Sequence, residues 1–458
     1  MNRCTVLVLA AGQGTRMRSR LPKVLHPLAG RPLLWHILQA VRGLRPERIV
    51  VVTGFQAEAV EQSLAAPDLH WVRQYERKGT GHAVQCALPM LQGLTGELLI
   101  LNGDHPLITT PILEKLLHHH REQGVALTVL STLLDNPSGY GRVVRNAQGE
   151  ILRIVEHKDA TAEERALREV NSGFYCVSLD RLPAWVGALG NQNAQNEYYL
   201  PDILPMAIAS GGASALRFED AQALSGVNDR AQLAQLERVY RDRRIVHWMN
   251  QGVSFVDPDS CWVAADVVIG MDTVIEPHVI LGPGTAVGEG CAIGPYCHIQ
   301  ESVIGADCRI LPFSHLDGAE IEADCDIGPY ARLRPGSRLA RKVKVGNFCE
   351  IKKSTIGAGS KVNHLSYIGD AQVGSGVNVG AGTITCNYDG VHKHRTVIGD
   401  HVFVGSDVQF VAPVQVGTGA TIGAGTTVTK DVPADSLAIS RSHQTHVMGW
   451  SEKRKPRS

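Results

Sequence analysis

A glycine-containing loop near the N-terminus has the residue types that bind phosphate. Residues 9–17 read Leu-Ala-Ala-Gly-Gln-Gly-Thr-Arg-Met, and Lys23 follows. Glycines let backbone N–H groups approach phosphate oxygens, and Arg16 and Lys23 add positive charge to the same loop. The loop lacks both the third glycine of a dinucleotide-binding fingerprint and the Gly-Lys-Ser/Thr ending of a P-loop. A simple glycine turn is the alternative for Gly12 and Gly14 taken alone.

A second set of reactive side chains lies in the C-terminal half. Polar residues gather in two stretches, 333–367 and 379–395, within an otherwise repetitive sequence. A lone histidine among 19 is more often a surface residue, which is the alternative for His364. Its company of arginine, lysine, glutamate, tyrosine and asparagine favours a functional role instead.

The segments around the second set repeat with a period of six. Apolar residues at this spacing are Ile269, Ile275, Leu281, Val287, Ile293 and Ile299, and the same register returns as far as Val428. Six fits neither a helix nor simple strand alternation, so each unit is predicted to be a short strand plus a corner. Three such units make one coil of a parallel β-helix, with about nine coils spaced about 4.8 Å apart. Periodicity does not give the hand, and crossover connections are normally right-handed.

Five cysteines fall into this repeat. Each stands four residues after an apolar anchor, and they are Cys291, Cys297, Cys308, Cys325 and Cys349. This spacing predicts small interior side chains. A metal site is the alternative, disfavoured because the chain has no Cys-x-x-Cys pair. Free thiols of this kind suit a reducing cytosol.

The N-terminal half alternates strand-like and helix-like segments. The strand-like runs are 5–10, 48–53, 97–102 and 126–132, separated by helical patterns such as 32–41 and 82–91. This alternation predicts a Rossmann-like α/β domain with a mostly parallel sheet and a ligand at the carboxyl ends of its strands. A helical pattern over 229–251 predicts a connecting helix. Its arginines could instead contact nucleic acid, which the balanced charge of the chain disfavours.

Composition excludes several classes of partner. The 458 residues suffice for two or three domains, and the 45 basic residues equal the 45 acidic ones, so no strong field recruits nucleic acid or a membrane surface. No run approaches 18 apolar residues, and the first apolar run is too short for a signal peptide. We expect a soluble cytoplasmic protein that acts on small molecules, with no nucleic-acid partner and no membrane insertion.

Two families share these motifs. The glycine loop closely resembles the signature of sugar-nucleotide pyrophosphorylases, and the hexad run resembles the hexapeptide-repeat acyltransferases, which implies a left-handed parallel β-helix. From about residue 5 to 450, the motifs and their order resemble one family of bacterial bifunctional enzymes of UDP-N-acetylglucosamine synthesis. The resemblance implies two reactions, acetyl transfer from acetyl-CoA to glucosamine 1-phosphate and then uridylyl transfer from UTP to the product, which releases pyrophosphate. It also implies a role in supplying precursor for peptidoglycan and lipopolysaccharide.

For the uridylyltransfer site, the resemblance implies a set of nucleotide and sugar contacts. Lys23 and Arg16 would neutralise phosphate charge, and Asp104 and Asn228 would hold Mg²⁺, a hard cation suited to oxygen ligands. Asn102 departs from the family, where an aromatic residue is usual. The implied UTP and UDP-N-acetylglucosamine contacts are Leu9, Ala10, Ala11, Gly12, Lys23, Gln74, Gly79, Thr80, Asn102, Gly103, Asp104, Gly141, Glu156, Asn171 and Asn228.

For the acetyltransfer site, the resemblance implies His364 as general base, oriented by Glu350. Glucosamine 1-phosphate would be held by Arg334, Lys352, Tyr367 and Asn378. Acetyl-CoA would be contacted by Ala381, Asn387, Tyr388, Ser406, Ala424 and Arg441, with the segment 387–388 stabilising the oxyanion.

The implied organisation is a pyrophosphorylase domain over 1–229, a linker helix over 230–251 and an acetyltransferase β-helix domain with a tail over 252–458. Relatives form homotrimers in which neighbouring subunits complete the acetyl-CoA site. Two alternatives stay open. One is a monofunctional pyrophosphorylase of the glucose or mannose type, with a non-catalytic repeat domain. The other is a non-catalytic scaffold subunit.

Overall fold

The computed structural model describes residues 4–441 and 443–454. The chain divides into two compact units, Met1–Tyr240 and Arg241–Ser458. The division falls inside α8 (Arg230–Asn250), the helix that links them. Among the described residues, no helix combines the length and the apolar character that a membrane crossing requires.

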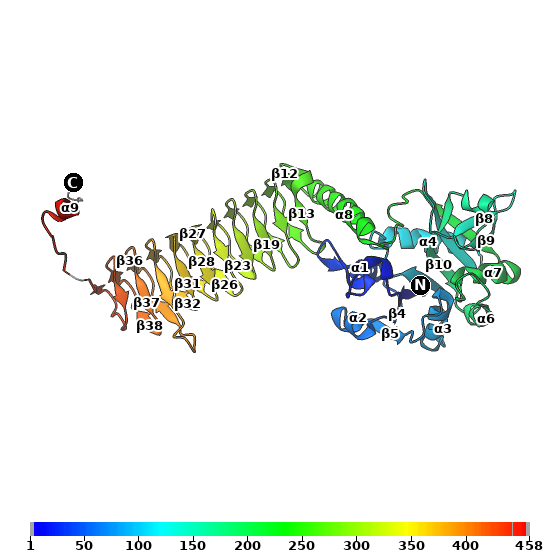
Figure 1. The fold of residues 1–458 in the computed structure, drawn as a ribbon, viewed down its shortest axis with the longest axis horizontal. Helices are drawn as coiled ribbons and strands as arrows, with labels where there is room; N and C mark the ends of the chain where they lie inside the picture. The colour runs from blue at the N-terminus through cyan, green and yellow to red at the C-terminus, as the bar shows by residue number, and fades with distance from the viewer. Residues whose placement is uncertain (1–3, 442, 455–458) are drawn as a thin grey trace. The chain divides into compact units, whose positions relative to one another are not determined.

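The first unit is built on one mixed sheet of nine strands (Figure 1). The main path runs β11-β7-β10-β6-β1-β4-β5 and is parallel except for β10, which is antiparallel to both neighbours. A hairpin of β8 and β9 extends from β10. The predicted strands are confirmed. The bounds are β1 (Cys4–Ala10), β4 (Arg48–Thr53), β5 (Leu69–Arg73), β6 (Glu97–Asn102), β7 (Leu127–Leu133), β8 (Arg142–Arg145), β9 (Ile151–Val155), β10 (Glu169–Ser178) and β11 (Ala213–Phe218).

Helices cover both faces of this sheet, because its strands are apolar on both faces. Along β1, Val6 and Val8 pack in one core with α1 and α4, while Leu7 packs in the other with α3, α6 and α7. The helices are α1 (Leu33–Gly43), α2 (Ala57–Ser63), α3 (Thr80–Leu91), α4 (Thr110–Gln123), α5 (Ala162–Arg165), α6 (Leu182–Gly187) and α7 (Ile203–Gly211). The carboxyl ends of β1 and β6 are neighbours, so the loops after them meet at one edge.

The second unit is a left-handed parallel β-helix of hexapeptide repeats. Its strands, from β12 (Ser254–Phe255) to β41 (Leu437–Ala438), form three parallel sheets of 11, 10 and 9 strands (Figure 1). The predicted anchors fill the interior, and Ile275, Ile293 and Ile310 stack in register, each fully buried. The coils begin before the predicted residue 269.

The coils continue through the stretch where the hexad pattern fails. Glu350 pairs with Arg332 on one side and Tyr367 on the other, so the step shortens without breaking the ladder. The interruption lies later, where residues 387–395 leave the coil as a small hairpin around the Tyr388–Lys393 pair. The strands used below are β25 (Arg332–Leu333), β27 (Lys344–Asn347), β28 (Glu350–Lys352), β30 (Lys361–His364), β31 (Tyr367–Gly369), β33 (Asn378–Val379), β34 (Ile384–Cys386) and β35 (Thr396–Ile398).

The five repeat cysteines are buried inside the prism, as predicted. Their thiols bond to backbone carbonyls of the next coil, as Cys291 Sγ does to Gly305 O at 3.1 Å and Cys308 Sγ to Glu322 O at 3.2 Å. Burial raises the pKa of Cys297 to about 11. These thiols therefore act as small core side chains that also satisfy backbone acceptors.

Candidate active sites

Two adjoining pockets open at the carboxyl ends of β1 and β6. The larger has a volume of about 540 Å³ and contains the glycine loop, and the smaller has a volume of about 240 Å³. Leu9, Thr80, Asn102 and Asp104 line both pockets. An elongated ligand could therefore pass from one pocket to the other along Asp104.

The residues predicted for the first site gather around these pockets. The larger is lined by Leu9, Ala10, Ala11, Gly12, Lys23, Gln74, Gly79, Thr80, Asn102 and Asp104. The smaller adds Arg16, Gly141, Glu156, Asn171 and Asn228. Gly103 lines neither pocket, and its N–H donates to Leu9 O at 2.9 Å. It thereby joins the ends of β1 and β6 beneath the pockets.

Asp104 carries a strong electrostatic perturbation. Its carboxylate is ion-paired with Lys23 and lies 2.8 Å from His105 Nδ1. Burial alone would raise the pKa of Asp104, but the charges of Lys23 and His105 and their hydrogen bonds lower it well below the usual range. Asp104 is therefore a carboxylate at any physiological pH.

Asn228 is held next to Asp104 by the backbone. Val227 N–H donates to Asp104 O at 2.9 Å, and Asn228 Oδ1 accepts from Arg16 Nη2 at 2.9 Å. A carboxylate and an amide oxygen in one pocket fit a hard cation such as Mg²⁺. Among the described residues, no group of three or more His, Cys, Asp or Glu is arranged to hold a metal. The other ligands of such an ion would come from water and substrate phosphates, as is usual for Mg²⁺.

The smaller pocket contains a second carboxylate, Glu156, whose pKa is shifted in the opposite direction from that of Asp104. Burial raises the pKa of Glu156, and the nearby charges of Asp202, Asp159 and Glu197 raise it further. On β10, Asn171 Nδ2 donates to Tyr175 Oη at 2.7 Å. This end of the site is therefore rich in hydrogen-bonding groups and suits a sugar.

Arg142 supports the smaller pocket and was not predicted. Only 1% of it is exposed, and its guanidinium donates to the carbonyl of Tyr140, to His157 Nδ1 at 3.3 Å and to Arg165 O at 3.4 Å. Tyr140 lines the pocket. A buried arginine is unusual, and no local pattern in the sequence marks it.

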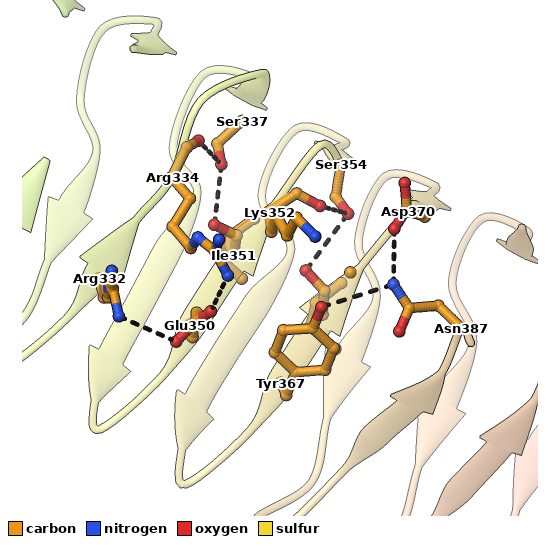
Figure 2. A network of polar contacts seen from close by, with 12 residues as sticks. Arg332, Arg334, Ser337, Glu350, Ile351, Lys352, Ser354, Tyr367, Asp370 and Asn387 are labelled. Carbon is orange, nitrogen blue, oxygen red and sulfur yellow. Dashed lines mark hydrogen bonds and ion pairs between the residues drawn. The ribbon is translucent and has the colours of Figure 1, made fainter. Parts of the chain in front are cut away.

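Four of the residues predicted for the second site lie on one sheet of the β-helix. Figure 2 shows Arg334, Glu350, Lys352 and Tyr367 on successive strands β25, β28 and β31 or directly after them. Glu350 accepts from Arg334 Nη1 at 2.9 Å and lies 3.8 Å from Arg332 Nη1 (Figure 2). Glu350 therefore fixes the arginine predicted to bind phosphate.

His364 has a different partner from the one predicted. Its Nδ1 lies 2.8 Å from Asn347 Oδ1, on the adjacent strand β27. The resemblance implied that Glu350 orients His364. The geometry instead engages the Glu350 carboxylate with Arg334, because Glu350 faces outward on a different sheet from His364. His364 itself is exposed.

Tyr367 and Asn387 are linked by hydrogen bonds at the base of the hairpin. Asn387 Nδ2 donates to Asp370 Oδ2 at 2.5 Å and to Tyr367 Oη at 3.5 Å (Figure 2). The Tyr367 ring lies over Gly369, where a Cβ would collide with the hydroxyl. The tyrosine is therefore held between a glycine and an asparagine.

Lys393, on the same hairpin, was not predicted. Lys352 is close enough that its side chain and positive charge lower the pKa of Lys393. Two lysines and Arg334 thus place several positive charges on one face. Such a face suits a phosphate ester.

Three of the residues predicted to contact acetyl-CoA, Ala381, Ser406 and Ala424, form one column with His364 along a corner of the prism. Gly382 N–H donates to His364 O, Asp407 N–H to Ala381 O, and Gly425 N–H to Ser406 O, so the column reads His364, Ala381, Ser406 and Ala424 on consecutive coils. A Cβ on Gly423 would lie 3.5 Å from the Arg441 guanidinium, which therefore stands beside the end of the column. Asn378 lies on β33, opposite Lys361 of β30.

Comparison with known proteins gives matches in both units. Residues 6–171 match the MobA-like NTP transferase domain, and residues 395–430 match the bacterial transferase hexapeptide (six repeats). The chain is 51% identical over 451 residues to the bifunctional protein GlmU of Trichlorobacter lovleyi, covering 98% of each chain. It is 52% identical over 460 residues to that of Pelobacter propionicus, covering 100% of each, and 48% identical to that of Stutzerimonas stutzeri, covering 98% of this chain and 99% of the relative. The chain belongs to the family of the bifunctional protein GlmU.

Proposed function

We propose that this enzyme makes UDP-N-acetylglucosamine by two reactions in two separate sites. The second unit transfers an acetyl group from acetyl-CoA to the amine of glucosamine 1-phosphate. The first unit then joins the product to the uridylyl group of UTP and releases pyrophosphate. The observation that carries the proposal is that one chain holds both a glycine-containing loop whose Lys23 is ion-paired with Asp104 and, in its other unit, an exposed histidine held by Asn347.

In acetyl transfer, the proposed base is His364. The sugar amine attacks the thioester carbonyl carbon, and His364 accepts the proton that the nitrogen loses. The carbon–sulfur bond then breaks, and the CoA sulfur leaves with a proton returned by the imidazolium. Arg334, Lys352 and Lys393 bind the phosphate of the sugar.

The oxyanion of the acetyl transfer needs a donor, and Tyr388 can supply one. In the Tyr388–Lys393 pair, the hydrogen bonds run between the flanking residues, from Asp389 N to His392 O and from His394 N to Asn387 O. The N–H of Tyr388 therefore points away from Lys393. The N–H of Asn387 already donates to Thr385 O at 2.9 Å, so Tyr388 is the better candidate.

In uridylyl transfer, the chain positions two phosphate groups and needs no covalent intermediate. The phosphate of N-acetylglucosamine 1-phosphate attacks the α-phosphorus of UTP, and pyrophosphate leaves. Lys23 and Arg16 neutralise charge, the loop 11–14 presents backbone N–H groups, and Glu156 and Asn171 hold the sugar. Mg²⁺ held by Asp104 and Asn228 would supply further charge neutralisation when bound.

Assembly and location are part of the proposal. We infer a homotrimer, in which neighbouring subunits complete the acetyl-CoA site, because the column from His364 to Ala424 runs along an outer corner of one prism. Three copies about one axis would close the assembly. All ten cysteines are free, which supports a cytoplasmic enzyme.

The test is incubation of the full chain with glucosamine 1-phosphate, acetyl-CoA, UTP and Mg²⁺. We expect UDP-N-acetylglucosamine, free CoA and pyrophosphate. Release of pyrophosphate from supplied N-acetylglucosamine 1-phosphate without any acetyl transfer would support the monofunctional alternative. Neither product would support the scaffold alternative.

A further inference from the structure

Asn347 and His364 are neighbours on consecutive coils of the β-helix. β27 and β30 pair in register with Asn347 opposite His364, and Leu365 N–H donates to Asn347 O at 3.1 Å. This ladder brings Asn347 Oδ1 within 2.8 Å of His364 Nδ1. The contact is therefore set by the backbone register rather than by a long flexible side chain.

The contact determines which nitrogen of the imidazole can act as a base. An amide oxygen can only accept a hydrogen bond, so Nδ1 of His364 must carry the proton. In the neutral ring, the lone pair is then on Nε2. We propose that Asn347 is the positioning residue of His364, holding the Nδ1–H tautomer so that Nε2 takes the proton from the sugar amine. This proposal rests on the proposed role of His364 as acetyltransfer base.

The charged side chains near His364 do not orient its ring, so the neutral amide of Asn347 does. On β27, Lys344 is ion-paired with Asp326 at 3.0 Å. On β30, the strand of His364, the other ionisable residue is Lys361. The coil above presents Asn378 and Ala381, which carry no charge. On the neighbouring sheet, Glu350 is engaged by Arg334. A neutral partner orients the ring without favouring its protonated form, whereas a carboxylate would favour that form.

The test compares variants of Asn347 in the full-length enzyme, with acetyl transfer to glucosamine 1-phosphate measured from pH 5.5 to 9. We expect Asn347→Ala to lower kcat about 10- to 100-fold, the range seen when a metal-bound histidine loses the hydrogen-bond partner of its other ring nitrogen. The KM values for both substrates should stay within about threefold, because Asn347 is not proposed to touch either substrate.

Asn347→Asp tests whether Asn347 acts through His364, because a purely structural role would not shift the pH profile of kcat. A carboxylate accepts the same Nδ1 proton, so kcat should recover relative to Asn347→Ala at high pH. Its negative charge also favours the protonated ring, so the acid limb of the kcat profile should move to higher pH by about one unit. Uridylyl transfer should be unchanged in both variants, because its residues lie in the first unit. An unchanged thermal unfolding transition reports that the β-helix is folded.

Glu350→Gln distinguishes the two possible partners of His364. If Glu350 positions Arg334, this variant raises the KM for glucosamine 1-phosphate and leaves the acid limb in place. The proposal is overturned if Asn347→Ala keeps the wild-type kcat and pH profile while Glu350→Gln lowers kcat and shifts the limb. A failure of the base assignment itself has a separate signature, since His364→Ala would then retain acetyl transfer.

Discussion

Lys23 and Asp104 lie 81 residues apart in the sequence and form a direct ion pair at the edge where β1 and β6 end. The cation of the phosphate-binding loop and the carboxylate proposed to hold Mg²⁺ are thus in contact. A phosphate that binds beside Lys23 is therefore adjacent to Asp104 as well. This relationship explains why the two pockets of the first unit share Asp104.

Asp104→Ala should abolish uridylyl transfer and spare acetyl transfer. It removes the proposed metal ligand and leaves Lys23 without its partner. We expect a loss of about 100-fold or more in pyrophosphate release, the scale of deleting one preorganised electrostatic group. Acetyl transfer should stay within a few-fold of the wild type, because its residues lie in the other unit. Near-normal pyrophosphate release by the variant would remove Asp104 from the metal site.

Glu156→Gln should stabilise the first unit while weakening sugar binding. Burial and three neighbouring carboxylates raise the pKa of Glu156, so the folded state favours its protonated form. Stability is then greatest below the unfolded pKa of about 4.3 and falls as pH rises toward the folded pKa, above which the penalty is constant. Glutamine does not ionise and escapes this penalty.

Calorimetry at two pH values checks the Glu156 prediction. The variant should show a higher Tm than the wild type at pH 8 and little difference at pH 4. The KM for N-acetylglucosamine 1-phosphate should rise, and the KM for UTP should not. A variant less stable than the wild type at pH 8 would show that the carboxylate is compensated in the folded protein.

Arg142→Met should destabilise the first unit and loosen the sugar pocket. The substitution leaves the carbonyl of Tyr140, the carbonyl of Arg165 and His157 Nδ1 without their donor, and each lost hydrogen bond of a typical kind costs about 0.5–1.5 kcal/mol. Because Tyr140 lines the pocket, the KM for N-acetylglucosamine 1-phosphate should rise more than that for UTP.

Arg142→Lys is the matched control for Arg142→Met. It keeps the charge but supplies a single ammonium, which cannot reach all three acceptors. An intermediate KM is expected for this variant. Equal KM values in the wild type and both variants would mean that Arg142 supports the fold without shaping the pocket.

The residues that face the interior of the β-helix were predictable, because each apolar anchor must be buried. Ile275, Ile293 and Ile310 recur at a fixed step, and a residue that must be buried can face only the interior. The strands 48–53 and 97–102 were equally clear, since they are continuous apolar runs buried on both faces. Local pattern was sufficient in both cases.

The side-chain partnerships were less predictable because they depend on register between coils. Asn347 and Glu350 both lie on the coil before that of His364. The observed pairing of β27 with β30 places Asn347 directly opposite His364. Lys393 lies near Lys352 because the hairpin folds back onto the sheet. The periodicity of the sequence does not predict this hairpin.

Ala424→Leu should obstruct acetyl-CoA without harming the fold. Ala424 is exposed on the column that begins at His364, three coils or about 14 Å away. A leucine there would project into the path proposed for the CoA chain. We expect the KM for acetyl-CoA to rise about tenfold, equivalent to about 1.4 kcal/mol, while the KM for glucosamine 1-phosphate stays unchanged.

Ala358→Leu is a closely matched control, because Ala358 and Ala424 occupy the same position in two copies of the tetrapeptide Ile-Gly-Ala-Gly. Both alanines are exposed, and the glycines that follow them have nearly equal φ angles, 69° at Gly359 and 71° at Gly425. The two leucines therefore face the same local backbone at different corners of the prism. If both variants raise the KM for acetyl-CoA equally, the effect is general to the β-helix. A rise in the Ala424 variant alone places the CoA chain along the column of His364.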